Sequence, residues 1–539
     1  MREQGRQVGD QTLRAYDRSV DPIVATGVIL VAAVVAFVSN KIPLGIVAIG
    51  VVLALTFTGV LTLPEALAGF GDPTVLFIAA LFIVSESLDA TGVTAWAGQV
   101  VIGRAGTSRF RLLLLITLLV AGLSSLISVS GAVAALVPLV VVVAARAGIA
   151  SSQLLMPLAF SAHAGSMLLL TGTPVNIIVS DIAAGAGGRT FGYFEFALVG
   201  IPLVAGTVLI ILLFGKRLLP EREAQRMPLD LLRHVSLLRN QYDIDLETSA
   251  LFGPANGVAE VLVPPRSPLI GQKLTPGMAT PSGDLVLLAA RRGGDLLRGG
   301  TFLAQAGDAL LVQGPWDLLQ SRTSTGGVVP VRSPATMRRS VPLGRGARRA
   351  LVILGAMVVL LATGVVPAAA AALMAACALV LSRVLTTEQA YRSVSWTTVV
   401  LIAGMIPLSV AFEKTGAADL VARGILNVLG DSGPYLALLV ICLITIVLGQ
   451  MISNTATVLV VAPIAISIAL ALGASVQPFM MALTVAGAAS FFTPVATPAN
   501  LMIMEPGGYR FGDYWRLGLP LSLLFLAVAV LYVPLIWPF

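Results

Sequence analysis

The sequence predicts an all-α polytopic membrane protein built as two inverted repeats, with a small α/β domain inserted between them. Three observations predict this fold class. Of the 539 residues, 57% are hydrophobic and 11% are charged, whereas soluble domains carry about 25% charged residues. Apolar runs of roughly 17 to 20 residues, long enough to cross a bilayer as helix, recur along the chain. Short sequence matches also recur between the two halves at a nearly constant offset.

Each half contains five apolar segments that we expect to cross the membrane, and one re-entrant hairpin. The expected spans are 22–38, 43–60, 74–90, 154–180 and 194–215, then 350–366, 367–382, 396–412, 478–503 and 517–537. The apolar blocks 110–146 and 434–472 are interrupted near the middle by small polar residues. Backbone that breaks helical pairing at membrane depth is tolerated only where protein or a water-filled cavity satisfies it. Each block therefore predicts a hairpin of two half-helices next to a site.

The two halves repeat each other in sequence. Thr91-Gly92 matches Thr415-Gly416, and the stretch Thr173–Asn176 matches Thr497–Asn500, both 324 residues apart. Because each unit contains an odd number of crossings, the second copy must run through the membrane in the opposite direction. Inverted repeats of this kind are typical of secondary transporters.

The chain divides into four parts, which are a polar tail (1–21), a first membrane repeat (22–215), an insertion (216–349) and a second membrane repeat (350–539). Within the insertion we expect strands at 257–263, 283–290 and 307–313, and helices at 267–274 and from Trp316. Seven arginines between Arg322 and Arg349 form its basic end. The positive-inside rule therefore places the insertion in the cytoplasm of a multi-pass protein of the cell (inner) membrane. The same rule accounts for the net charge of +7, so nucleic acid is not an expected partner.

Four interruptions carry the candidate chemistry. The hairpin tips are Ser128–Ser130 and Ser453–Thr455, and the breaks in the fourth spans are Gly172–Asn176 and Ala496–Asn500. A proline in each break removes a backbone donor and causes unwinding. Freed carbonyls suit a hard cation, while helix N-termini favour an anion. Taken singly, such Ser, Thr and Asn residues are also common packing residues between membrane helices.

Three further polar residues lie in apolar segments. Glu86 lies within the third span and is a candidate proton site, because burying an acid there is costly. Asp89 lies near a span end, where we expect solvation, and His163 is predicted to be a neutral, hydrogen-bonded packing residue. The sequence contains no paired acid and base, activated nucleophile, metal-ligand spacing or ATP-binding motif. An enzyme is therefore not expected, and no catalytic residue is assigned.

The triplet Ser453-Asn454-Thr455, together with the breaks that follow each hairpin, resembles the divalent anion/sodium symporter (DASS) family over about 22–215 and 350–537. The resemblance implies secondary active transport of a sulfate, dicarboxylate or citrate anion, coupled to Na+, by an elevator-type movement. The implied substrate-binding residues are Ser128, Ser130, Thr173, Asn176, Ser453, Asn454, Thr455, Thr497 and Asn500. The implied sodium ligands are Ser128, Gly172, Ser453, Asn454 and Ala496. Val129 departs from the family pattern, because an Asn is expected there, and this weakens the first sodium site.

The insertion, over about 255–325, resembles the RCK-C (TrkA-C) regulatory domain of potassium-conductance regulators. The resemblance rests on Ala259–Val263, Ser267–Gly271 and Gly307–Val312. It implies a cytoplasmic sensor with a possible nucleotide ligand, and a homodimer in the lipid bilayer. No Gly-rich phosphate loop is present in the insertion, and transport itself needs no cofactor beyond the coupling ion.

Two alternatives stay open from the sequence. One is a cation/proton antiporter or arsenite-type carrier of the same superfamily, with Glu86 as its proton site. The other is a membrane-anchored nucleotide sensor that does not transport. The residues accept sulfate and carboxylates alike, so the sequence does not choose the anion.

Overall fold

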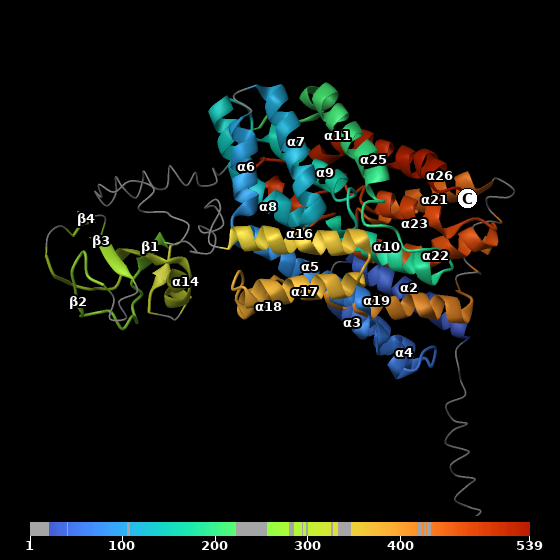
Figure 1. The fold of residues 1–539 in the computed structure, drawn as a ribbon, viewed down its shortest axis with the longest axis horizontal. Coiled ribbons are helices and arrows are strands. Elements are labelled where there is room, and N and C mark those ends of the chain that lie inside the picture. The colour runs from blue at the N-terminus through green and yellow to red at the C-terminus, as the bar shows by residue number, and fades with distance from the viewer. Residues whose placement is uncertain are drawn as a thin grey trace, which may run out of the picture.

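The computed structural model describes most of the chain. The described residues are 21–39, 41–104, 108–222, 256–279, 285–293, 295–297, 300–324, 327–331, 346–417, 420, 423, 424, 427 and 433–539. They form a mostly helical protein with one small group of strands (Figure 1). The predicted tail and part of the insertion lie outside the described residues.

The two halves have the same order of helices. The first half contains α2 (Pro22–Ser39), α3 (Leu44–Phe57), α4 (Leu63–Leu67), η1 (Ala68–Gly71), α5 (Pro73–Ala90), α6 (Val93–Gly103), α7 (Arg109–Leu126), α8 (Val129–Ala147), α9 (Ser152–Gly165), η2 (Leu170–Gly172), α10 (Pro174–Gly185) and α11 (Ala197–Leu218). The second half contains α16 (Ala347–Thr363), α17 (Ala368–Leu381), α18 (Thr387–Ser393), α19 (Trp396–Thr415), α21 (Gly433–Leu448), α22 (Asn454–Ala471), α23 (Val476–Gly487), α24 (Pro498–Met504), η3 (Phe511–Asp513), α25 (Tyr514–Ala527), η4 (Val528–Tyr532) and α26 (Val533–Ile536). From α2 and α16 to α10 and α24, corresponding helices begin 323 to 325 residues apart.

The same capping chemistry begins the short helices α4 and α18. The backbone N–H of Thr62 donates to Glu65 Oε2 at 2.8 Å, and that of Thr386 donates to Gln389 Oε1 at 2.9 Å. Such a capping box satisfies donors that the first helical turn leaves unpaired. The repeat is therefore visible in local hydrogen bonding as well as in helix order.

Among the described residues, six helices are long and apolar enough to cross a membrane, or seven if one bent pair counts as a span. The six are Pro22–Ser39, Leu63–Ala90, Arg109–Leu126, Ala197–Leu218, Asn454–Ala471 and Phe511–Ile536, and the bent pair is Thr387–Ser393 with Trp396–Phe412. On α2, Val24, Val28 and Val35 are exposed while Ile29 and Phe37 are buried. An exposed apolar stripe of this kind is stable in lipid rather than in water. The helices α7, α8 and α22, on either side of the predicted hairpin tips, have 18, 19 and 18 residues, close to the lengths that the interrupted apolar blocks predicted.

The helices pack as two bodies, and each body draws on both halves of the chain. The first body consists of α2–α5 and α16–α19, with α3 against α19 and α5 against α17. The second body consists of α6–α11 and α21–α26, with α9 against α7 and α11, and α23 against α21 and α22. Figure 1 shows α16–α19 beside α3–α5, and α6–α11 beside α21–α26. The bodies meet along α19 and α22, and where α5 contacts α6, α8 and α10.

The insertion forms an antiparallel sheet with the strand order β4-β3-β6-β1-β7. Its strands are β1 (Asn256–Leu262), β3 (Val286–Arg292), β4 (Asp295–Leu296), β6 (Ala309–Pro315) and β7 (Val329–Pro330), and β2 (Lys273–Leu274) pairs separately with β5 (Phe302–Leu303). Helix α14 (Trp316–Ser324) packs on this sheet. A Cβ at Gly257 would lie 2.2 Å from the Trp316 ring, so only glycine fits beneath that side chain.

The predicted helix at 267–274 is wrong. Turns occupy residues 265–266 and 268–271, and β2 follows. Gly271 has a φ of +81°, which is outside the helical region and suits glycine. The Ser267 hydroxyl donates to Gly327 O, which satisfies it within the turn.

Candidate functional site

Both fourth spans are broken where the prolines predict. In the first half, α9 ends at Gly165 and α10 begins at Pro174; in the second, α23 ends at Gly487 and α24 begins at Pro498. Thr173 and Thr497 cap the new helices. Thr173 Oγ1 accepts from the Val175 N–H at 3.4 Å, and Thr497 Oγ1 accepts from the Asn500 N–H at 3.3 Å.

An asparagine fastens each unwound segment. The Asn176 amide donates to Ser166 O at 3.0 Å and to Leu169 O at 2.9 Å. The Asn500 amide donates to Ser490 O at 2.8 Å and to Thr493 O at 3.1 Å. The acceptors lie ten and seven residues before the asparagine in both halves. The two breaks are therefore the same structure made twice.

Each of these asparagines also presents an acceptor that no described residue uses. Asn176 Oδ1 and Asn500 Oδ1 are buried and have no partner among the described residues within hydrogen-bond distance, although the His163 side chain lies close to the Asn500 amide. Both asparagines are fully buried. A buried acceptor without a partner costs about 1–3 kcal/mol. A bound cation, or a donor that arrives with a ligand, would remove that cost.

The second hairpin tip is connected to the second break. Ser453 Oγ caps α22 by accepting from the Ala456 N–H at 3.3 Å, and Asn454 Oδ1 accepts from Ser490 Oγ at 2.5 Å. Gln450, just before the tip, donates to Ala489 O at 3.0 Å and accepts from the Phe492 N–H at 2.9 Å. The predicted residues Ser453, Asn454, Thr497 and Asn500 thus belong to one connected structure, with Ala496 buried beside Thr497 and Thr455 half-buried in the first turn of α22. We call Ser453, Asn454, Thr455, Thr497 and Asn500, with the backbone at Ala496, the second clamp.

The first hairpin tip has fewer connections of this kind. Ser128 Oγ caps α8 by accepting from the Gly131 N–H at 3.1 Å, and the Ser128 N–H contacts Ser85 Oγ at 3.4 Å. Val129 offers no counterpart to the Asn454 amide, and Ser130 is half-buried in the first turn of α8. We call Ser128, Ser130, Thr173 and Asn176, with the backbone at Gly172, the first clamp.

Acidic side chains of α5 lie near the first tip. A Cβ at Gly131 would lie 3.0 Å from Ser128 Oγ and 3.3 Å from Asp89 Oδ2. Asp89, which the sequence predicts to be solvated, therefore lies beside the hairpin tip. Glu86, the predicted proton-site candidate, is half-buried one turn earlier on the same helix.

The helices that carry the clamps pack against each other across the two halves. Helix α24 packs against α8 and α9, and α10 packs against α22 and α23. His163 of α9 places its Nε2 3.2 Å from Thr497 Oγ1. Each half's broken helix therefore packs against helices of the other half, including one arm of its predicted hairpin.

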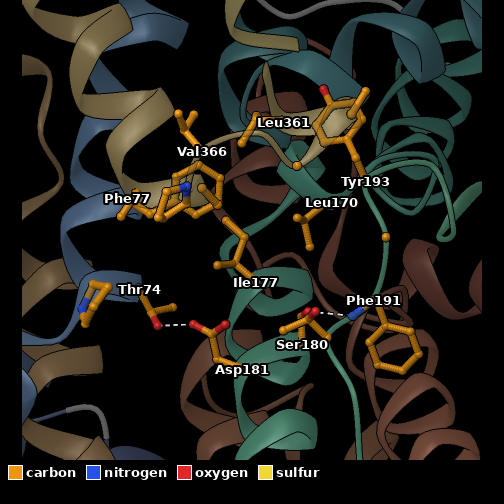
Figure 2. Close-up of a pocket in the computed structure, with 18 of the residues that line it drawn as sticks. Thr74, Phe77, Leu170, Ile177, Ser180, Asp181, Phe191, Tyr193, Leu361 and Val366 are labelled. Atoms are coloured by element: carbon orange, nitrogen blue, oxygen red, sulfur yellow. Dashed lines mark hydrogen bonds between the residues drawn. The ribbon is translucent and has the colours of Figure 1, made fainter. Parts of the chain in front are cut away.

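A cavity of about 470 Å³ lies at the seam between the two bodies (Figure 2). Its wall combines Thr74 of α5, Asp181 of α10, the loop 190–193 and the turn between α16 and α17. The Thr74 hydroxyl donates to the Asp181 carboxylate, and Ser180 Oγ accepts from the Phe191 N–H at 2.9 Å. Sequence reasoning missed this seam, although Asp181 directly follows an expected span and could have been noticed as an acid beside an apolar run.

Hydrogen bonds lead from the cavity toward the first hairpin. The Thr171 hydroxyl donates to Ser125 O at 3.3 Å and lies 3.2 Å from Tyr193 Oη. Since Thr171 has one proton to donate, Tyr193 is the donor in the second contact. Leu170, the neighbour of Thr171, lines the cavity. The cavity wall is thus continuous with the loop of the first clamp.

Among the described residues, no group of three or more His, Cys, Asp or Glu side chains could hold a metal ion. Any cation at the clamps would be bound by hydroxyl, amide and carbonyl oxygens. Such oxygens are the ligands of hard cations.

Many apolar helices and paired helix breaks define the class of this protein, which is a multi-pass membrane transporter. The profile of the citrate transporter family (CitMHS) matches residues 34–486 and 437–539. The chain belongs to this family.

Several relatives of the chain are transporters by name. It is 31% identical to the uncharacterized transporter YfbS of Escherichia coli (strain K12), over 95% of this chain and 98% of that protein. It is 28% identical to the uncharacterized transporter sll0640 of Synechocystis, over 94% and 96%. Sodium/sulfate cotransporter 2 of Chlamydomonas reinhardtii is 28% identical over 28% of this chain and 17% of its own length. The crystal structure of the Alcanivorax borkumensis YdaH transporter covers 90% of both chains, with 16% identity and a TM-score of 0.48.

Proposed function

We propose that this protein is a secondary active transporter that moves a small divalent anion or oxyanion, of the sulfate, dicarboxylate or citrate class, together with Na+. The observation that carries the proposal is the pair of clamps, each of which contains a buried asparagine amide oxygen without a hydrogen-bond partner among the described residues. The naming of one relative as a sodium/sulfate cotransporter supports this choice of anion and ion.

The clamps can hold an anion without a fixed positive charge. The helices α8, α10, α22 and α24 all begin at the tips or breaks. Their first N–H groups and positive dipole ends attract an anion, at about 0.3–1 kcal/mol for each helix end when exposed. Hydroxyl and amide groups of Ser, Thr and Asn add hydrogen bonds. Binding of this strength permits release, which a carrier requires.

Sodium would bind next to the anion, at the hairpin tips and the unwound backbone. The second site would use Ser453, Asn454 and the backbone at Ala496, and the first would use Ser128 and the backbone at Gly172. The donor set fits, since hydroxyl and carbonyl oxygens suit a hard cation. Val129 removes one oxygen from the first site, so we propose that the second sodium site binds more tightly.

The movement would be an elevator-type displacement of the second body against the first. The clamps lie in the second body, whereas the contact of Thr74 with Asp181 crosses the seam. In this proposal the α7–α8 and α21–α22 pairs are re-entrant, ten spans cross the bilayer, and the halves are inverted repeats. Five crossings in each half, an odd number, would make the second half run through the bilayer in the opposite direction to the first.

The sheet domain would act as a cytoplasmic regulator, with a nucleotide as its possible ligand, in a homodimer. The basic residues between Arg322 and Arg349 support a cytoplasmic location. The RCK-C resemblance supports the regulatory role and the dimer.

The test is uptake of labelled sulfate, succinate and citrate into proteoliposomes, with and without an inward Na+ gradient. Asn454→Ala removes the acceptor of Ser490 Oγ, and the exposed Asn427→Ala is its control. Sodium-driven uptake that Asn454→Ala reduces at least tenfold and Asn427→Ala leaves unchanged would support the proposal. Uptake driven by a proton gradient and lost in Glu86→Gln would favour the antiporter-type alternative. No uptake under any gradient would favour the sensor.

A further inference from the structure

One cross-half hydrogen bond has no counterpart in the repeat. His163 of α9, in the first half, is buried, with 3% of its surface exposed. Its Nε2 lies 3.2 Å from Thr497 Oγ1, which caps α24 in the second half. The edge of its ring packs against Phe491, with the ring centres 5.8 Å apart.

The repeat places a glycine at the position equivalent to His163. That residue is Gly487, 324 positions further along the chain, just as Thr497 is the equivalent of Thr173. A Cβ at Gly487 would lie 2.8 Å from Val458 Cγ2, so a side chain does not fit there. The second clamp therefore has an imidazole beside its capping threonine, and symmetry provides none for the first.

The Thr497 hydroxyl, which His163 contacts, already has one hydrogen-bond partner. Thr497 Oγ1 accepts from the Asn500 N–H at 3.3 Å. A hydroxyl has two acceptor positions and one proton to donate. If His163 Nε2 carries the proton of the neutral ring, it fills the second acceptor position. The Thr497 proton must then point away from both donors.

We propose that His163 is a positioning residue that orients the Thr497 hydroxyl so that it donates its proton to the transported anion. The inference rests on the proposed function, because it presumes that an anion binds at the second clamp. The sulfate and carboxylate oxygens of the proposed anions are acceptors only, so a hydroxyl directed toward them as donor strengthens binding. The opposite tautomer would consume the Thr497 proton at Nε2 and leave the anion facing oxygen lone pairs.

The experiment is a double-mutant cycle on anion uptake by the full-length protein in proteoliposomes, with labelled sulfate, succinate and citrate as probes. His163→Leu removes the donor at similar volume, and Thr497→Val removes the hydroxyl. We expect His163→Leu to raise KM about tenfold with a smaller change in kcat, because a lost hydrogen bond to a charged group is worth about 1.4 kcal/mol or more. With Thr497→Val already present, His163→Leu should have less than a twofold further effect.

Thr173→Val provides the matched control, because Thr173 occupies the equivalent position without the imidazole. In the double mutant, the fold-changes in KM of Thr173→Val and His163→Leu should multiply, because the two residues act independently. His163→Gln keeps an N–H donor, so it should restore KM to within about threefold of wild type. If His163→Leu does not fold, His163→Met replaces it, since Met and Gln are both unbranched and only Gln donates.

Three results would overturn the inference. The first is that the fold-changes in KM of His163→Leu and Thr497→Val multiply in the double mutant as fully as those of His163→Leu and Thr173→Val do. The second is that His163→Gln is no better than the apolar variant. Either result, with anion uptake intact in wild type, rejects the role of His163 and leaves the proposed function standing. The third is an absence of anion uptake by wild type, which rejects both.

Discussion

Replacing Asn500 by leucine should disrupt the second break. Leucine has the same branching and the same number of side-chain heavy atoms as asparagine, although it is bulkier, and it cannot donate to Ser490 O and Thr493 O, which Asn500 reaches at 2.8 and 3.1 Å. Two carbonyls in an unwound segment would lose their partners. Net hydrogen bonds are worth about 0.5–1.5 kcal/mol each, and buried groups left unpaired cost more, so we expect about 2–3 kcal/mol in total.

This cost predicts a measurable loss of transport. A free energy of about 2–3 kcal/mol corresponds to roughly a 30- to 150-fold change in an equilibrium. We expect kcat/KM for sodium-driven anion uptake to fall by this factor in Asn500→Leu. The same change should speed hydrogen exchange at the Phe492 amide, which donates to Gln450 Oε1 beside the break.

Two comparisons make this prediction specific. Asn176→Leu removes the equivalent pair of bonds in the first half, so hydrogen exchange in that loop should respond by a similar factor. Asn427→Ala, at an exposed position, should change neither measurement. Unchanged exchange at Phe492 in Asn500→Leu would refute the reasoning, because the loop would then not depend on the asparagine.

The remaining predictions concern a glycine, the seam and the sheet domain. Gly172→Ala should abolish uptake, because its Cβ would lie 2.1 Å from Ser166 O, a backbone atom that cannot give way cheaply. A disulfide or short thiol crosslink between cysteines at Thr74 and Asp181 should stop uptake reversibly, because their side chains touch across the seam. Burial alone would raise the pKa of the Asp308 carboxyl, but hydrogen bonds from Arg292 and a backbone N–H lower that pKa below 3.8. Stability from this pair is therefore complete above about pH 4 and is lost as the pH falls through the lower folded pKa, which hydrogen exchange of the β6 amides should report.

Each of these predictions has its control. A Cβ at Gly185, at the end of the following helix α10, would meet no atom within 4 Å. Gly185→Ala should therefore be tolerated, and equal damage from both glycine variants would contradict the steric explanation. The crosslinking background replaces Cys377 and Cys442 by serine, and uptake that continues after complete crosslinking would reject movement at the seam. Arg292→Met should shift the acid sensitivity of the sheet to higher pH. No shift would mean that the Arg292 guanidinium contributes nothing to the pair.

The sequence by itself determined the features that depend on neighbours along the chain. Apolar runs predicted that apolar helices recur along the chain, and six or seven of the described helices are long enough to cross a membrane, against the ten spans expected. Pro174 and Pro498 predicted where two helices break, because a missing N–H acts locally. The constant offset predicted that helices would recur in the same order, and they do. The error at 267–274 is also local, since the turn at Gly271 outweighed a weak helical pattern.

Only the tertiary structure decided which of these features meet. The contacts of His163 with Thr497 and of Thr74 with Asp181 join residues 334 and 107 positions apart. The position of Asp89 beside Gly131 likewise depends on how α5 packs against α8. Hydropathy and spacing describe single segments, whereas these contacts depend on how two bodies, each assembled from both halves, fit together. The chemistry of the clamps, including their difference at Val129 and Asn454, is therefore present in the sequence, whereas the imidazole beside the second clamp appears only when the halves are packed.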